Sequence, residues 1–195
     1  LLSSNADIVF HDLYSMREEN KLRAWSYTNS RSLGANPYEN LIRHGNVLCN
    51  SSVMVKRSAL DDIGGFSEDR NLISWEDFDA WLRLAKNQFN FSKVQGVYGY
   101  RWVGGGNITN PKRTLDNIEA FLESYIQEST EIIPWWCHYV RGVSYMKLGE
   151  IDRVRPALRS AWFAQKNIFK RIKIIIRYMI LNFTYISNFK RNNNK

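Results

Sequence analysis

Cysteine, histidine and proline are all scarce in this sequence of 195 residues. The two cysteines, Cys49 and Cys137, lie far apart, and the three histidines form no pair with a cysteine or another histidine at the spacing of a zinc site. A disulfide framework and a metal site built only from protein side chains are therefore not expected. Two free thiols fit a reduced compartment, and we expect the protein in the cytoplasm.

A leader peptide and a long apolar run are also missing. The sequence begins with Leu1 and shows neither a charged first region nor a small-residue cleavage site, so we expect no signal peptide and a start inside a longer protein. The uncharged stretch 178–189 has 12 residues, which is too short to cross a bilayer as a helix.

Acidic residues are missing from the last part of the sequence. Asp152 is the final acid, and 11 basic residues follow it. Residues 1–110 balance 12 basic against 12 acidic residues, so the net charge of +8 comes from 111–195. The apolar and basic stretch 168–189 has two open interpretations: a helix on an anionic membrane surface, or a last bundle helix with solvated charges. No nucleic-acid-binding motif accompanies the charge, and we expect no nucleic acid partner.

The order of sequence patterns predicts an α/β part followed by an all-helical part. Apolar or alternating stretches at 6–10, 52–55, 89–94 and 97–102 predict strands, the one at 52–55 buried, with an irregular excursion at 13–45. Helical periodicity then appears at 114–125, 132–148 and 154–165. The expected domains are 1–110 and 111–195. The glycines at 104–106 fit either a linker or a flap over a diphosphate.

Three acidic residues, Glu76, Asp77 and Asp79, lie within four positions. The stretch 75–86 has the periodicity of a helix with one buried side, and Ser74 stands where an N-cap is expected. In the simpler interpretation, the acids complement the positive end of the helix dipole. In the other, one of them faces a cleft as a general base. A helix N-terminus lowers the pKa of a carboxyl group and burial raises it, and the pattern does not decide between them.

The segments on both sides of these acids give them a family context. Upstream, a strand ends in Lys56 and Arg57, a short helix follows, and Ile-Gly-Gly-Phe-Ser-Glu occupies 63–68; downstream, Tyr100 and Arg101 end a strand. In this order and spacing, residues 6–101 resemble the second half of a family 2 glycosyltransferase domain. The resemblance implies a partial GT-A fold, in which a sheet is accompanied by helices.

The resemblance also implies a reaction and a set of site residues. The expected activity is an inverting transfer of a sugar from a nucleotide-diphospho-sugar to a glycan or lipid-linked acceptor, as in polysaccharide biosynthesis at the cell envelope. Asp77 matches the family's catalytic base, and Glu76 is expected to orient it or to bind an acceptor hydroxyl. The predicted acceptor-binding residues are Trp75, Asp79, Arg101 and Trp102.

Members of this family hold a divalent metal, Mn or Mg, through an Asp-x-Asp motif in the preceding, nucleotide-binding half. No such motif stands before Asp7, so that half is expected to be missing, the cofactor-binding residues stay unassigned, and the chain alone is not expected to be active. The basic tail would place the protein on the inner face of the cell membrane. The alternative is a non-catalytic or degenerate module that binds a partner.

Overall fold

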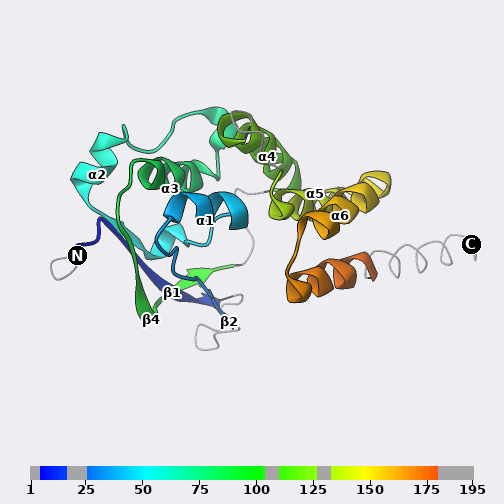
Figure 1. Ribbon diagram of the computed structural model, residues 1–195, viewed down its shortest axis with the longest axis horizontal. Helices are drawn as coiled ribbons and strands as arrows, with labels where there is room; N and C mark the ends of the chain where they lie inside the picture. The colour runs from blue at the N-terminus through cyan, green and yellow to red at the C-terminus, as the bar shows by residue number, and fades with distance from the viewer. Residues whose placement is uncertain (1–4, 17–25, 104–109, 127–132, 180–195) are drawn as a thin grey trace, which may run out of the picture. The chain divides into compact units, whose positions relative to one another are not determined.

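A computed structural model describes residues 5–16, 26–103, 110–126 and 133–179 (Figure 1). The chain divides into two units, Leu1–Thr109 and Asn110–Lys195. The first unit is mixed α/β and the second is helical. The predicted linker or flap at 104–106 and the part of the predicted tail beyond residue 179 lie outside the described residues.

One long strand, β1 (Ile8–Met16), organises the sheet of the first unit. It pairs in parallel with β4 (Phe91–Trp102) and antiparallel with two short strands, β2 (Ser26–Tyr27) and β3 (Val53–Val55). β2 pairs near one end of β1, at Tyr14 and Ser15, and β3 pairs near the other, at 8–10. β1 is buried along most of its length, because it has neighbouring strands on both edges.

The strands differ from their predicted bounds in three ways. β1 does not end at 10 but continues through Asp12 to Met16, because side chains nearby pair the buried carboxylate of Asp12. β3 is half-exposed, and Met54 points into solvent, so the prediction of a buried strand at 52–55 was wrong. The two stretches 89–94 and 97–102 form the single strand β4, which Gly96 bends with a φ of 121°.

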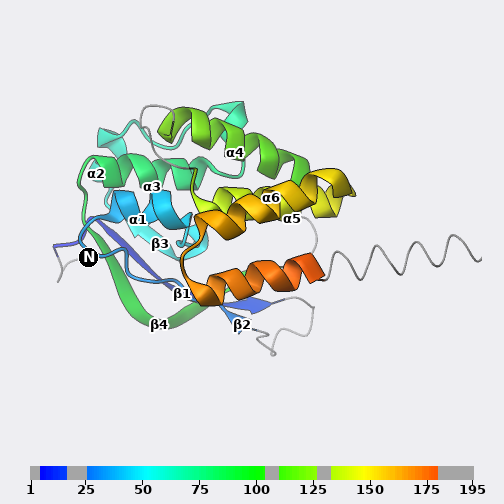
Figure 2. The same cartoon turned by 45° about the vertical axis from the view of Figure 1, so that its right-hand side comes forward.

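Three helices accompany this sheet. They are α1 (Pro37–His44), α2 (Arg57–Asp62) and α3 (Glu76–Lys86), with short 3₁₀ turns η1 (Asn50–Ser52) and η2 (Arg70–Leu72) between them. Gly64 and Gly65 follow α2 with φ of 76° and 78°, which glycine adopts without steric cost. α1 and α3 pack on each other and lie on the same face of the sheet in Figures 1 and 2.

The core of the first unit lies between that sheet face and the helices. The predicted apolar side of α3 is confirmed, and all its members are buried: Phe78, Trp81, Leu82 and Ala85. Apolar residues of β1 and α1 are buried as well, among them Ile8, Phe10 and Leu41, and α1 packs on α3. Because the four residues of α3 face the core, the opposite side of α3 faces away from it.

The second unit is built from α4 (Pro111–Tyr125), α5 (Trp135–Leu148), α6 (Ile151–Ala164) and a further helical stretch, 168–179. Gly149 ends α5 in the left-handed conformation. A Cβ on Gly142 would lie 2.7 Å from Leu158 Cδ2, so glycine lets α5 and α6 approach closely. No helix among the described residues has the length and apolar character needed to cross a membrane.

Candidate functional site

The first turn of α3 begins from a strained backbone. Ser74 has a φ of 76°, a left-handed conformation that non-glycine residues rarely adopt, and the Trp75 amide closes the turn onto the Leu72 carbonyl at 2.7 Å. The prediction that Ser74 caps the helix was wrong, because an N-cap residue needs extended backbone angles. Trp75 takes the cap position instead and contributes no side-chain hydrogen bond there.

Asp77 is half-buried in this turn, and its surroundings shift the pKa of its carboxyl group. Burial raises the pKa of its carboxyl group to about 6, and the negative charge of Glu76 adds to that rise. Hydrogen bonds from the Phe78 amide, at 2.6 Å to Asp77 Oδ1, and from the Asn46 side chain act in the opposite direction. Burial therefore outweighs the hydrogen bonds that act on this carboxyl group.

Two buried polar atoms close to Asp77 have no hydrogen-bond partner among the described residues. They are the hydroxyl oxygen of Ser74 and the Oε2 atom of Glu76. A buried polar atom without a partner costs stability, so such atoms are rare in folded proteins. Backbone strain, unpaired polar atoms and a perturbed carboxyl group within four residues are features that cluster at functional sites.

The remaining predicted residues of this turn are held by side-chain contacts. Asp79 accepts from Arg83 Nε at 2.8 Å, and Arg83 also donates to the carbonyl oxygens of Ile63 and Gly65. Arg83, which Asp79 holds, thus ties α3 to the loop after α2. The ring of Trp75 meets that of Phe78 edge to face at 5.8 Å. The acceptor-binding roles of Trp75 and Asp79 stay predictions.

Arg101 and Trp102 lie apart from α3 along the chain, as the last two residues of β4. Arg101 Nε donates to Ser15 Oγ of β1 at 3.3 Å. Trp102 is exposed and belongs to a set of rings that we name the aromatic row, which runs over β1, β2 and β4 and consists of Tyr14, Tyr27, Tyr100 and Trp102. The predicted acceptor-binding residues therefore form two groups, one on α3 and one at the end of β4.

The strand register creates the aromatic row. Tyr14 is the register partner of Tyr27 on one neighbour and of Tyr100 on the other, and the rings of Tyr14 and Tyr100 lie 5.5 Å apart at an angle of 30°. Tyr100 is 66% exposed, so α1 and α3 do not cover it. Tyr98 does not belong to the row, because the register shifts between Asp12 and Tyr14 and its ring lies against His11. Sequence reasoning missed the row apart from Trp102, although the alternation at 100 and 102 was a usable signal.

A buried ion pair supports the strands that carry the row. Lys93 Nζ lies 2.7 Å from Asp12 Oδ2, and Ser30 donates to Asp12 Oδ1 through its amide and its hydroxyl. Thr28 Oγ1 donates to the same oxygen. Burial alone would raise the pKa of Asp12, but the hydrogen bonds from Lys93, Ser30 and Thr28 together lower it to about 2. No local sequence pattern pointed to this group, because its members are distant along the chain.

The acids of α3 do not form a metal site in this arrangement. In the part of the chain that the structure describes, no group of three or more histidine, cysteine, aspartate or glutamate side chains is placed to hold a metal ion. Asp79 is engaged by Arg83, and Asp77 is bonded to a backbone amide. The divalent metal of the resembled family therefore has no ligand set among these residues.

Comparisons of the chain with protein-family models, with curated proteins and with solved structures found no match.

Proposed function

We propose that this chain is part of a glycosyltransferase in which Asp77 is the catalytic base. The observation that carries the proposal is the half-buried Asp77, with a pKa raised to about 6, beside the strained Ser74 and the partnerless oxygen of Glu76. The resemblance of residues 6–101 to family 2 glycosyltransferases supports the same assignment. The donor, in this proposal, is a nucleotide-diphospho-sugar.

In this proposal, Asp77 accepts a proton from the acceptor. Its carboxylate removes the proton of an acceptor hydroxyl while that oxygen attacks the anomeric carbon of the donor, and the nucleoside diphosphate leaves from the opposite side. A base works best when its pKa lies near the working pH, because it is then ionised and still basic. A pKa of about 6 meets both conditions in a neutral cytoplasm. Glu76 would keep its neighbour basic through its charge.

The test is a transfer assay on the natural full-length protein. Uridine, guanosine and thymidine diphospho-sugars are offered with glycan and lipid-linked acceptors, and release of nucleoside diphosphate is measured. We expect release that depends on the acceptor, with a rate that falls below about pH 6 as Asp77 becomes protonated. If no donor gives acceptor-dependent release, the proposal fails.

A second candidate function, glycan binding without catalysis, is favoured by the aromatic row. The face of a sugar ring carries C–H groups and its rim carries hydroxyls, and a tyrosine offers an apolar ring and a polar hydroxyl to match. Nucleic acid bases also stack on aromatic rings, but such sites need cations along the strand. Residues 1–110 have balanced charge, which favours the uncharged ligand.

We expect this chain to bind a neutral hexasaccharide, such as cellohexaose or chitohexaose, through the aromatic row. Tyr100→Ala removes the central ring of the row and should weaken binding about fivefold, which corresponds to about 1 kcal/mol for one ring contact. Isothermal titration calorimetry measures the change. The matched control is Phe163→Ala, which removes another exposed ring, in the second unit. Equal weakening by both substitutions, or no binding by the unchanged chain, would remove this candidate.

A further inference from the structure

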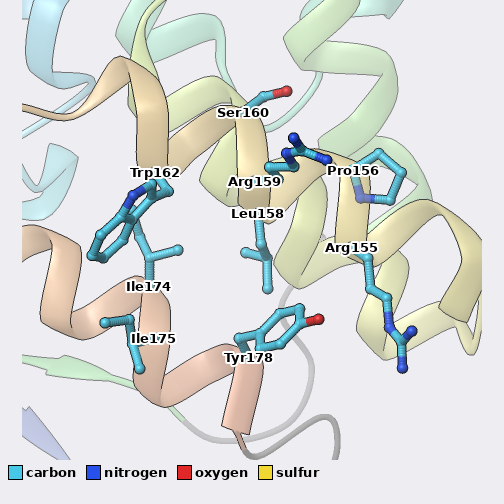
Figure 3. Close-up of a pocket in the computed structure, with 9 residues that line it drawn as sticks. All are labelled: Arg155, Pro156, Leu158, Arg159, Ser160, Trp162, Ile174, Ile175 and Tyr178. Atoms are coloured by element: carbon cyan, nitrogen blue, oxygen red, sulfur yellow. The ribbon is translucent and has the colours of Figure 1, made fainter.

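A groove runs between α6 and residues 168–179 in the second unit (Figure 3). Its volume is about 610 Å³, which is within the range of small-molecule sites in proteins. Leu158 and Ile174 are 2% and 3% exposed and form its most buried part, and both belong to the core of this unit. In Figure 3 the ring of Tyr178 points toward Leu158, with Trp162 at the other side of the view.

The charged residues that line this groove are all basic. Arg155 and Arg159 stand one turn apart on α6, and among the residues that the structure describes no acid lines the groove. Arg159 lies over the Phe163 ring at 5.7 Å. An arginine side chain has five N–H donors, so it can bind a phosphate group beside its other contacts. The groove thus combines an apolar interior with a cationic edge.

Four basic residues of the stretch 168–179 contact aromatic residues of α5 and α6. Three of its cations lie over aromatic rings of α5 and α6, at 5.3, 5.0 and 5.3 Å from the ring centres: Lys170 over Trp135, Arg171 over Trp162, and Lys173 over Tyr139. Arg177 Nε donates to the hydroxyl of Tyr139. Such contacts stabilise a cation. The predictions for the stretch 168–189 had its charges in solvent or on a membrane. In the described part, three cations contact rings and Arg177 contacts a tyrosine hydroxyl, while Lys173 is also exposed.

The other side of 168–179 is apolar and open to solvent. Its exposed members are spaced as one face of a helix, and they are Ile168, Phe169, Ile172, Ile175, Ile176 and Met179. Ile175 lines the groove as well, so the groove and this exposed face are continuous. Exposed apolar surface of this kind normally marks a place where a ligand, partner or membrane binds.

We propose that the second unit binds an anionic membrane lipid. Its hydrocarbon chain lies in the groove against Leu158 and Ile174, its phosphate-bearing head lies at the edge that carries Arg155 and Arg159, and the exposed apolar face of 168–179 rests in the membrane interface. A soluble phosphate would not contact the apolar interior, and a neutral hydrocarbon would bring no negative charge to the arginines. The lipid is the ligand that satisfies both, and its binding does not depend on sugar transfer.

The first test is flotation of the full chain with vesicles of phosphatidylcholine, with and without phosphatidylglycerol. We expect binding only when the anionic lipid is present. Arg155→Gln combined with Arg159→Gln should weaken that binding roughly 30-fold, the effect of losing two basic contacts near an anionic surface. The matched control is Lys147→Gln with Lys166→Gln, which removes two exposed charges that do not line the groove and should keep most of the binding. Equal weakening by both pairs would mean a general charge effect and would overturn the proposal.

The second test separates the groove from its charged edge. Lysophosphatidylglycerol below its micelle concentration should shift the methyl NMR signals of Leu158 and Ile174, because its chain lies against them. Glycerol 3-phosphate, which has the head but no chain, should leave these signals in place. The proposal is overturned if the lysolipid causes no methyl shift, even with vesicle binding intact, since the groove then has another occupant.

Discussion

Asp77→Asn is expected to abolish sugar transfer by the full-length protein while the fold stays intact. Asparagine has the shape of aspartate, and its carbonyl oxygen can still accept from the Phe78 amide, but it cannot take a proton at this pH. Loss of a positioned base lowers a rate by about 10²–10⁴. Acceptor-dependent release of nucleoside diphosphate measures the effect, and circular dichroism confirms that the variant is folded.

The same substitution should make the protein more stable above pH 6. Since burial raises the pKa of Asp77 to about 6 from its ordinary 3.8, the folded state binds its proton more tightly than the unfolded state does. This contribution to stability is present below pH 3.8 and is lost as the pH rises through 6. Asparagine never carries the buried charge, so its melting temperature should exceed that of the wild type at about pH 8 and match it near pH 4.

Asp69→Asn is the matched control for both measurements. Asp69 is exposed, and its side-chain oxygen accepts from the Asn71 amide, which asparagine can also do. Turnover and melting temperature should therefore hardly change. If the folded Asp77→Asn protein has wild-type turnover, Asp77 is not the catalytic base. If this variant is less stable than the wild type at about pH 8, burial of the Asp77 charge does not destabilise the protein.

Local periodicity predicted the helices better than it predicted their ends. The apolar stripe at 78, 81, 82 and 85 is a property of neighbouring residues, so it could be read from the sequence and proved correct for α3. The start of α3 could not be read from the sequence. The left-handed backbone at Ser74 belongs to a turn in which the Trp75 amide donates to the Leu72 carbonyl. The wrong prediction of the helix start affects the candidate site, because Asp77 is positioned by this turn and not by an N-cap at Ser74.

In the sheet, sequence patterns predicted neither the full length of β1 nor the register of the strands. A strand pattern at 6–10 was readable, but the continuation of β1 to Met16 depends on side chains that reach Asp12 from 28, 30 and 93. The aromatic row also exists only through the register that sets Tyr14 between Tyr27 and Tyr100. Register is a property of strand pairs far apart in the sequence, so a single sequence contains little information about it.

The ion pair of Asp12 and Lys93 is expected to carry more stability than any other in the first unit that the structure describes. Their side chains are only 8% and 10% exposed. Lys93→Met would leave the Asp12 carboxylate buried without its cation, and breaking a buried pair in this way costs about 3–5 kcal/mol. Denaturant unfolding of the full chain at neutral pH measures the loss.

Arg57→Met provides the comparison, because Arg57 and Asp61 form a pair whose side chains are 88% and 58% exposed. Losing this pair should cost at most about 0.5 kcal/mol. The double variant Asp12→Leu with Lys93→Met should be more stable than Lys93→Met alone, since no unpaired charge remains. If Lys93→Met costs no more than Arg57→Met, the buried pair does not hold the sheet.

The pH dependence of the wild type gives an independent check on the same pair. The hydrogen bonds to Asp12 hold its pKa at about 2, below its ordinary 3.8, so its contribution to stability is present above 3.8 and is lost as the pH falls through 2. Lys93→Met should remove most of this acid dependence. Because Thr28 and Ser30 bond to Asp12 beside β2, loosening the pair should also displace Tyr27 and weaken hexasaccharide binding. Weakened glycan binding at unchanged stability would show instead that Lys93 contacts the ligand.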